Sequence, residues 1–188
     1  MTISRRWRAR VFIATSLDGY IARSNGDISW LTDPPPGVEH APPVTGAIAP
    51  PDYETFMADI DHLVVGRATY ETVLTFDTWP YAGKDVVVLS TSLALDHDER
   101  ILIARNLDEA VRVLIRRGAR QVYVDGGQVI QAFLRADLID ELTIAHAPIL
   151  VGAGLPLFAG LDRDIPLSLR ASATSDAGMT HATYHVLR

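Results

Sequence analysis

The middle of the chain alternates between two hydrophobic patterns. Short, almost continuously apolar runs are typical of strands buried on both faces of a parallel sheet, and apolar residues three and four positions apart are typical of amphipathic helices. Strands that alternate with helices predict an α/β fold, a mainly parallel central sheet with helices on both faces. The predicted strands are Val11–Thr15, Leu63–Val65, Val86–Leu89, Ile101–Ala104, Gln121–Val124 and Ile139–Ala147, and the predicted helices are Asp52–Ile60, Thr69–Leu74, Asn106–Arg117 and a segment that begins at Gly126-Gly127.

Two segments depart from this alternation. Near the C-terminus, Leu167–Thr174 and Thr180–Leu187 flank Asp176-Ala177-Gly178, which predicts an antiparallel hairpin at one edge of the sheet. Residues 20–51 contain seven prolines, so we expect a long ordered loop or lid. Within it, the large apolar side chain of Trp30 should pack against the body of the protein. The whole pattern predicts a single three-layer domain over residues 1–188.

Composition narrows the possible functions. At 188 residues with 48% hydrophobic content, the chain can bury one substantial core. A net charge of -6 argues against nucleic acid and anionic membranes as partners, because both favour a basic surface. The absence of cysteine excludes disulfides, thiolate nucleophiles and cysteine metal sites. No apolar run approaches the roughly 20 residues needed to span a bilayer, so we expect a soluble, cytoplasmic protein.

Polar and glycine-rich turns follow three of the predicted strands. The carboxyl ends of parallel strands lie at one edge of a sheet, where ligands bind in open α/β folds. Glycine allows close backbone approach, and the N-terminus of a helix attracts phosphate groups. The turns are Gly66-Arg67-Ala68-Thr69, Ser90-Thr91 and Asp125-Gly126-Gly127.

Together, the three turns favour a dinucleotide with an extra phosphate, which Arg67 and the hydroxyls of Ser90 and Thr91 would hold. Taken singly, each turn has a simpler explanation, namely a tight turn without a ligand, a surface cation or a polar strand end. Other kinds of site lack support, because the sequence contains no HExxH, GxSxG or complete phosphate loop. His181 and His185 have no third ligand at metal spacing, so we expect no metal site.

Four longer motifs include these turns or lie beside them: Ala14–Ala22, Val65–Glu71, Tyr123–Gly127 and Ala147–Gly152. In order and spacing they resemble the dihydrofolate-reductase fold, and within it the family of the reductase domain of the bifunctional riboflavin-biosynthesis deaminase/reductase. The resemblance covers nearly the whole chain. It implies an NADPH-dependent oxidoreductase acting on a small molecule, similar to dihydrofolate reductase or to 5-amino-6-(5-phosphoribosylamino)uracil reductase, and a homodimer, for which the apolar C-terminal strands also argue.

The resemblance also assigns residues to the cofactor. The loop around Asp18 would border the nicotinamide with Trp30 closing over it, and the glycine turns would hold the pyrophosphate and the 2′-phosphate. The residues expected to bind NADPH are Ala14, Asp18, Gly19, Ile21, Trp30, Gly66, Arg67, Thr69, Ser90, Thr91, Asp125, Gly126, Gly127 and Gln128.

In dihydrofolate reductases an acidic residue and, one helical turn later, a phenylalanine line the pterin pocket, and Asp52 and Phe56 have this relation here. The resemblance therefore implies that Asp52, Phe56 and Trp30 contact the substrate and that Asp52 is catalytic. A general acid needs a raised pKa, which requires burial to outweigh the helix N-terminus. If Asp52 stays ionised, it would anchor an amino-pyrimidine edge of the substrate, and in the simplest case it only caps its helix.

One part of the riboflavin enzyme has no counterpart in the sequence. The deaminase half, with its zinc-binding Cys and His residues, is absent, so we do not expect a bifunctional enzyme. The alternative to a reductase is a nucleotide-binding protein of the same fold without turnover. The two differ in whether a competent substrate site accompanies the cofactor site.

Overall fold

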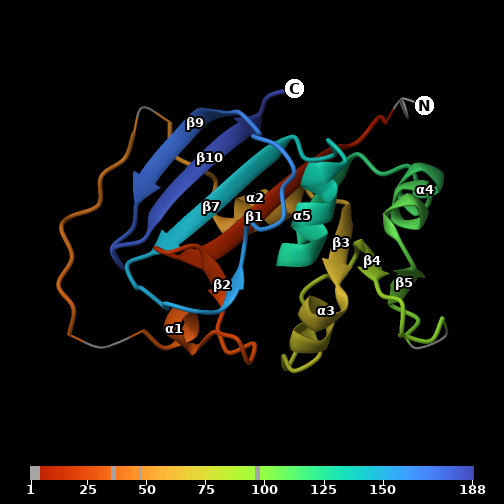
Figure 1. Cartoon of the computed structure of the whole chain (residues 1–188), viewed down its shortest axis with the longest axis horizontal. Coiled ribbons are helices and arrows are strands. Elements are labelled where there is room, and N and C mark those ends of the chain that lie inside the picture. Colours follow the sequence, from red (N-terminus) through yellow and green to blue (C-terminus); the bar gives the residue numbers. More distant parts are fainter. Residues whose placement is uncertain (1–4, 35–36, 47, 96–97) are drawn as a thin grey trace.

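Every strand and helix that the hydrophobic pattern predicts is present in the folded chain, with ends that differ by a few residues (Figure 1). The structure is a computed structural model that describes residues 5–34, 37–46, 48–95 and 98–188. The strands are β1 (Arg8–Ser16), β2 (Tyr20–Ala22), β3 (His62–Gly66), β4 (Asp85–Leu89), β5 (Ile101–Ala104), β6 (Gln121–Asp125), β7 (Glu141–Ala147), β8 (Leu155–Pro156), β9 (Leu167–Thr174) and β10 (Thr180–Val186). The helices are α1 (Ser29–Thr32), α2 (Tyr53–Asp59), α3 (Arg67–Val73), α4 (Leu107–Arg117) and α5 (Gly127–Arg135).

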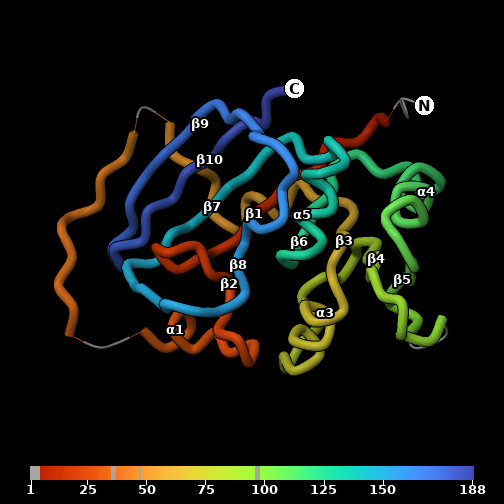
Figure 2. The backbone as a smooth tube through the Cα atoms, viewed as in Figure 1, coloured from red at the N-terminus to blue at the C-terminus, as the bar shows by residue number. Residues whose placement is uncertain are grey.

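Within the described residues, eight strands form one sheet in the order β5-β4-β3-β6-β1-β7-β10-β9. β1 and β3 to β7 are parallel, whereas β10 and β9 run antiparallel at one edge. This arrangement confirms the predicted mainly parallel sheet with an antiparallel hairpin. Two short strands, β2 and β8, were not predicted. They pair with each other as a separate two-stranded sheet, which Figure 2 shows beside the main one.

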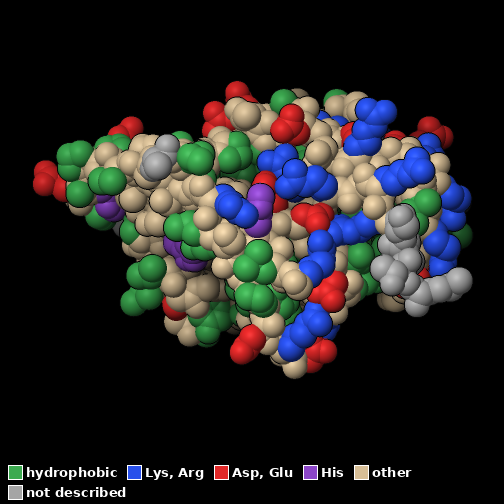
Figure 3. All heavy atoms as spheres, turned by 90° about the horizontal axis from the view of Figure 1, so that it is seen from above, with side chains coloured by type: hydrophobic (Ala, Val, Ile, Leu, Met, Phe, Trp, Pro, Cys, Tyr) green, Lys and Arg blue, Asp and Glu red, His purple; other side chains and the backbone are tan. Residues whose placement is uncertain are grey.

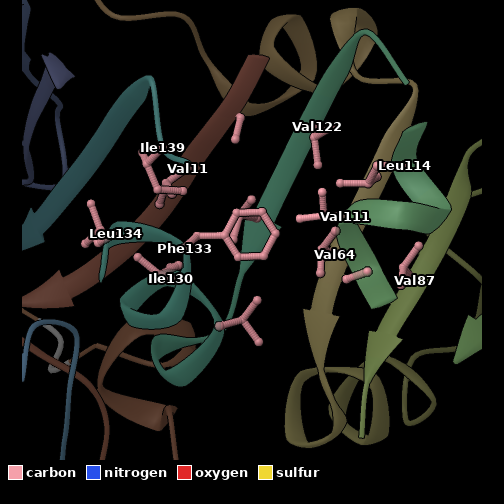
Figure 4. Close-up of a cluster of buried hydrophobic side chains, with 14 of the residues drawn as sticks. Val11, Val64, Val87, Val111, Leu114, Val122, Ile130, Phe133, Leu134 and Ile139 are labelled. Carbon is pink, nitrogen blue, oxygen red and sulfur yellow. The ribbon is translucent and has the colours of Figure 1, made fainter. Parts of the chain in front are cut away.

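Two hydrophobic cores lie on the two faces of the sheet. On one face, α5 and α4 bury Phe133, Ile130 and Leu114 against the strands, as the close-up in Figure 4 shows. On the other face, Phe56 of α2 and Tyr70 of α3 pack over β3, β4 and β6. Because both faces are covered, the central strands are almost wholly buried, which explains their continuous apolar runs.

The helices begin in two different ways. α2 and α4 are capped by side chains: Asp52 accepts a hydrogen bond from the N–H of Thr55 (2.7 Å), and Asn106 accepts one from Glu109 (2.9 Å). α3 and α5 begin at Gly66 and Gly126 without a side-chain cap. The first-turn N–H groups of a helix need a partner, so these two helices leave donors available at the carboxyl edge of the sheet.

Part of the proline-rich segment lies along the edge strand β9. Thr45 forms an antiparallel bridge with Ala173, the N–H of Gly46 donates to Ser172 (2.8 Å), and the N–H of Thr174 donates to Val44 (2.7 Å). We call residues 44–46 and 48 the strap. It covers the C-terminal part of β9, so this part of the sheet edge is already protected.

Charged side chains of both signs lie at the amino-terminal edge of the parallel strands. Figure 3 shows this end of the molecule with Lys or Arg side chains interleaved with Asp or Glu. Ion pairs such as Arg5–Asp140 and Arg8–Glu141 lie here, so these two arginines near the N-terminus have acidic partners. Among the described helices, none has the length and apolarity needed to cross a membrane.

Candidate functional site

A groove of about 780 Å³ lies at the carboxyl edge of β3, β4 and β6, and all three predicted turns line it. β2 and β8 form its opposite wall, with Ile21, Leu155 and Pro156 facing the turns. The sequence thus predicted the convergence of the turns, although not the strands of the opposite wall. The predicted cofactor residues that line the groove are Ile21, Gly66, Arg67, Thr69, Ser90, Thr91, Gly126, Gly127 and Gln128.

The two glycine turns touch each other, and this contact shapes the groove. Gly126 has a φ of 92°, which L side chains rarely adopt, and a Cβ there would lie 2.9 Å from Oγ1 of Thr69. A Cβ on Gly127 would lie 2.9 Å from Cδ1 of Ile21 on the opposite wall. A side chain at either position would force a neighbouring side chain to shift, and Gly126 needs glycine for its backbone conformation as well.

Two arginines approach the turn that follows β4. Nη1 of Arg67 donates to Oγ of Ser92 (3.2 Å), and Nη1 of Arg105 donates to the carbonyl of Ser90 (2.8 Å). The hydroxyl of Ser90 accepts hydrogen bonds from the N–H groups of Ser92 and Leu93, so it orders the turn. The groove therefore combines two guanidinium groups, several hydroxyls and an uncapped helix, a donor set suited to an anion.

Sequence reasoning missed Ser92 and Arg105, although both carried a signal. Ser92 extends the Ser90-Thr91 pair by one more hydroxyl. Arg105 directly follows β5, whose carboxyl end lies at the same edge of the sheet as the three turns. Because Arg105 stands directly before the predicted helix that begins at Asn106, it also fits a simple strand-to-helix connection.

Asp125 lies at the same edge, but its side chain faces away from the groove. On β6, Val122 and Val124 belong to the core under α4 and α5, whereas Tyr123 belongs to the core under α2. Side chains alternate along a strand, so Asp125 shares the α2 side with Tyr123. The side chain does not line the groove, and the expected role of Asp125 in binding the cofactor stays a prediction.

The surroundings of Asp125 change its acidity. Burial raises the pKa of Asp125 to about 6, although hydrogen bonds from the N–H of Gly126 and from the Tyr123 hydroxyl act in the opposite direction. Burial, and next the nearby negative charge of Asp125, raise the pKa values of Tyr53, Tyr81 and Tyr123. The half-buried carboxyl and the three tyrosines thus form one electrostatically coupled cluster, which we call the Asp125 cluster.

Comparison with known proteins agrees with this architecture. The profile of the RibD C-terminal domain matches residues 9–180. The chain belongs to this family. A solved protein of Shewanella sp. PV-4, whose name provisionally assigns it to riboflavin biosynthesis, is 36% identical and superimposes with a TM-score of 0.79, covering 96% of this chain and 99% of that one.

Two further comparisons bear on the family. The uncharacterized protein YwjB of Bacillus subtilis (strain 168) is 28% identical over 165 residues, which is 86% of this chain and 88% of that protein. Dihydrofolate reductase from Enterococcus faecalis, solved with NADP(H) and the compound RAB-propyl, has a TM-score of 0.66 at 19% identity, and the match covers 97% of this chain and 98% of that one. The RibD C-terminal domain described here therefore has the dihydrofolate-reductase-like fold, in a family of reductases.

Asp18, in the loop after β1, has a structural task in this RibD C-terminal domain. Its carboxylate accepts hydrogen bonds from Oγ of Ser16 (2.6 Å) and from the N–H groups of Val151 (3.1 Å) and Gly152 (2.7 Å). The bond from Ser16, with those from the backbone, lowers the pKa of Asp18 to about 2. The ionised carboxylate ties two loops together, and Asp18 itself does not line the groove.

Three other residues expected at the cofactor lie outside the groove lining: Ala14, Gly19 and Trp30. Trp30 is 3% exposed, which confirms that it packs against the body of the protein. Its indole Nε1 is buried without a hydrogen-bond partner among the described residues. Closure of Trp30 over the nicotinamide and contact with the substrate stay predictions.

The two residues expected in the substrate pocket on α2 differ in exposure. Asp52 is exposed, and the hydrogen bonds from Thr55 hold its pKa below the usual value. The helix N-terminus therefore outweighs burial, and Asp52 lacks the raised pKa that a general acid needs. Phe56 is fully buried against Phe12 and Tyr123, with ring centroids 5.1 Å apart in both pairs. Its side chain is not exposed in this conformation, and its contact with the substrate stays a prediction.

Tyr53 replaces Phe56 as the accessible aromatic side chain of α2. It is 44% exposed and packs edge-on against Phe12, with ring centroids 5.6 Å apart. The spacing of Tyr53 from Phe56 and Met57 fits one helical face, so spacing alone does not distinguish this exposed residue from the two buried ones. At the first position of α2 the ring is only partly covered and lies near enough to Asp125 for this carboxylate to raise the pKa of Tyr53.

Proposed function

We propose that the protein is an NADPH-dependent reductase that transfers a hydride to a small heterocyclic, pterin- or pyrimidinone-like, or carbonyl substrate. The observation that supports this most is the adjacency of two sites at one turn. The groove with Arg67 and Arg105 lies on one side of Gly126, and the Asp125 cluster lies on the other. A cofactor site beside a carboxyl group with a raised pKa is the arrangement that hydride transfer coupled to proton transfer requires.

The residues of the groove fit the phosphates of a dinucleotide. α5 starts without a side-chain cap, so its first-turn N–H groups suit a pyrophosphate. Arg67, Arg105 and the hydroxyls of Thr91 and Ser92 suit the additional 2′-phosphate that distinguishes NADPH from NADH. The RibD C-terminal family and the NADP(H) complex of the Enterococcus faecalis enzyme support the same choice.

Asp125 is the carboxyl group we propose as the proton donor, in place of Asp52. When bound, NADPH supplies the hydride, which adds to a carbon of the substrate. The neighbouring nitrogen or oxygen then gains negative charge that must be met by a proton. Asp125 gives up its proton to that atom, becomes a carboxylate, and is reprotonated from solvent. The Tyr123 hydroxyl donates to the carbonyl of Phe12 (2.9 Å), which fixes its ring beside Asp125.

The experiment is NADPH oxidation, followed by absorbance, against a panel of pterins, pyrimidinones and flavins. Turnover of at least one class, abolished in Asp125→Asn but retained in Asp52→Asn, supports the proposal. Failure of the wild-type protein to bind NADPH would refute it.

The second candidate is a nucleotide-binding protein of the same fold without turnover. One observation favours it: the cofactor groove is complete, whereas Phe56, expected in the substrate pocket, is buried in the core. Tight NADPH binding with no oxidation on any member of the panel would select this candidate.

We further propose a homodimer in the cytoplasm. The dimer rests on the family resemblance and on exposed apolar side chains of β9, Leu167 and Leu169, beyond the part that the strap covers. The location rests on the composition and on the supply of NADPH that such a reductase needs.

A further inference from the structure

The two sides of the Gly126 turn differ in charge. The groove side carries the cations Arg67 and Arg105. The α2 side carries the Asp125 carboxyl, the exposed carboxylate of Asp52 and the hydroxyls of the tyrosines in the Asp125 cluster. A ligand that reaches across the turn therefore passes from a cationic to an acidic environment.

Within the described residues, the cations that contact α2 or the aromatic residues around it are already matched. Nε of Arg10 donates to Glu141 (2.8 Å), and its guanidinium lies 4.8 Å from the ring centroid of Phe56. Nζ of Lys84 donates to the carbonyls of Met57 and Ile60, both at 2.7 Å. Lys84 thereby caps the C-terminal end of α2, where its charge complements the helix dipole.

The third cation near this side, Arg100, is matched as well. Its guanidinium pairs with Asp98 (2.7 Å) and stacks on Trp79, 4.4 Å from the ring centroid. The positions outside the described ranges contain neither Lys nor Arg. A phosphate on this side would therefore have to displace a cation from its present partner.

That displacement would be costly for a phosphate monoester. It carries a charge of about -2 near neutral pH and binds proteins through cationic or N–H donors. Beside Asp52 and the ionised form of Asp125 it would meet like charges in a partly desolvated environment, where repulsion is stronger than in water. The phosphates of the proposed cofactor would lie on the other side of the turn, beside Arg67 and Arg105.

We propose that the substrate of this reductase is an unphosphorylated heterocycle, neutral or cationic, whose polar ring atoms face Asp125 and the hydroxyls of Tyr53 and Tyr81. The proposal rests on the reductase function proposed above and deepens it. If it holds, this protein differs from a 5-amino-6-(5-phosphoribosylamino)uracil reductase, because the name of that enzyme shows that its substrate carries a phosphate. The chain would share the fold and the cofactor with that enzyme but act on a different class of molecule.

The test uses a ligand pair that differs by one phosphate: 5-amino-6-(ribosylamino)uracil and its 5′-phosphate, each titrated into the full-length protein saturated with NADPH. We expect the unphosphorylated member to bind at least about tenfold more tightly. Equal affinity, preference for the phosphate, or no binding of either member would overturn the inference. Because NADPH binding is measured first, failure of the cofactor site is distinguished from failure of this inference.

A charge-adding variant provides an independent test. Tyr53→Arg places a free cation on the α2 side and should improve binding of the phosphorylated member at least about tenfold. Ile115→Arg adds the same charge at a residue of similar exposure, 46% against 44%, on α4, which covers the opposite face of the sheet. This control should leave both affinities unchanged. An equal gain in both variants would show a net-charge effect and count against the proposal.

Discussion

At the scale of the residue, Asp125 carries the proposed chemistry and has a measurable signature. Its folded-state pKa, about 6, lies above the ordinary aspartate value of 3.8. The folded state therefore binds this proton more tightly than the unfolded chain does. The resulting stabilisation is fully present below pH 4 and is lost as the pH rises through about 6, at about 1.4 kcal/mol per unit of pKa difference.

Asp125→Asn keeps an oxygen that can accept from the N–H of Gly126 and removes the titration. We expect the variant to be more thermostable than the wild type at pH 8 and nearly equal at pH 4, with turnover reduced at least about 100-fold. Thermal unfolding at both pH values and steady-state kinetics test this. Equal stability differences at the two pH values would show that Asp125 does not titrate as described.

The two groove arginines should determine cofactor choice. Arg67→Ala and Arg105→Ala each remove a guanidinium from the groove, and a charge-assisted hydrogen bond is worth roughly 1.5–3 kcal/mol. We expect each to weaken NADPH binding at least about tenfold and NADH binding little, as measured by fluorescence titration. Arg112→Ala on α4 is the matched control. Equal losses for both cofactors would place the 2′-phosphate elsewhere.

At the scale of the element, the contact between the turns before α3 and α5 fixes the groove. Gly126→Ala combines a disfavoured φ with the contact to Thr69, so we expect it to cost more stability than Gly118→Ala, which shares a positive φ but has open space around it. NADPH binding should be lost only in Gly126→Ala. Thermal unfolding and titration measure both effects. Partial recovery in Gly126→Ala with Thr69→Ala would identify the contact as the cause, and unchanged NADPH binding in the single variant would contradict the assignment.

The sequence did not reveal β2 and β8, which are short strands that pair with each other although they lie far apart along the chain. β2 and β8 pair over two or three residues, and neither run has a hydrophobic period long enough to predict a strand. The full burial of Phe56 was not predicted for another reason: spacing shows which residues share a helical face but not how deeply that face is buried. The orientation of Asp125 was predictable, because it lies two residues from Tyr123 on one strand.

At the scale of the whole molecule, the strap and the edge strand β9 bear on assembly. The strap pairs with residues 172–174, whereas Leu169 is 57% exposed on the part of β9 that it leaves uncovered. An apolar edge of this kind favours association with a second copy. We therefore expect light scattering at micromolar concentration to give the mass of two chains.

The variant Leu169→Lys should give the mass of one chain, because burying an unpaired charge at the interface is costly. Leu150→Lys, a comparably exposed leucine at 70% in the loop after β7, should remain dimeric. A wild-type protein with the mass of one chain would contradict the dimer, and a dimeric Leu169→Lys variant would place the interface on another surface.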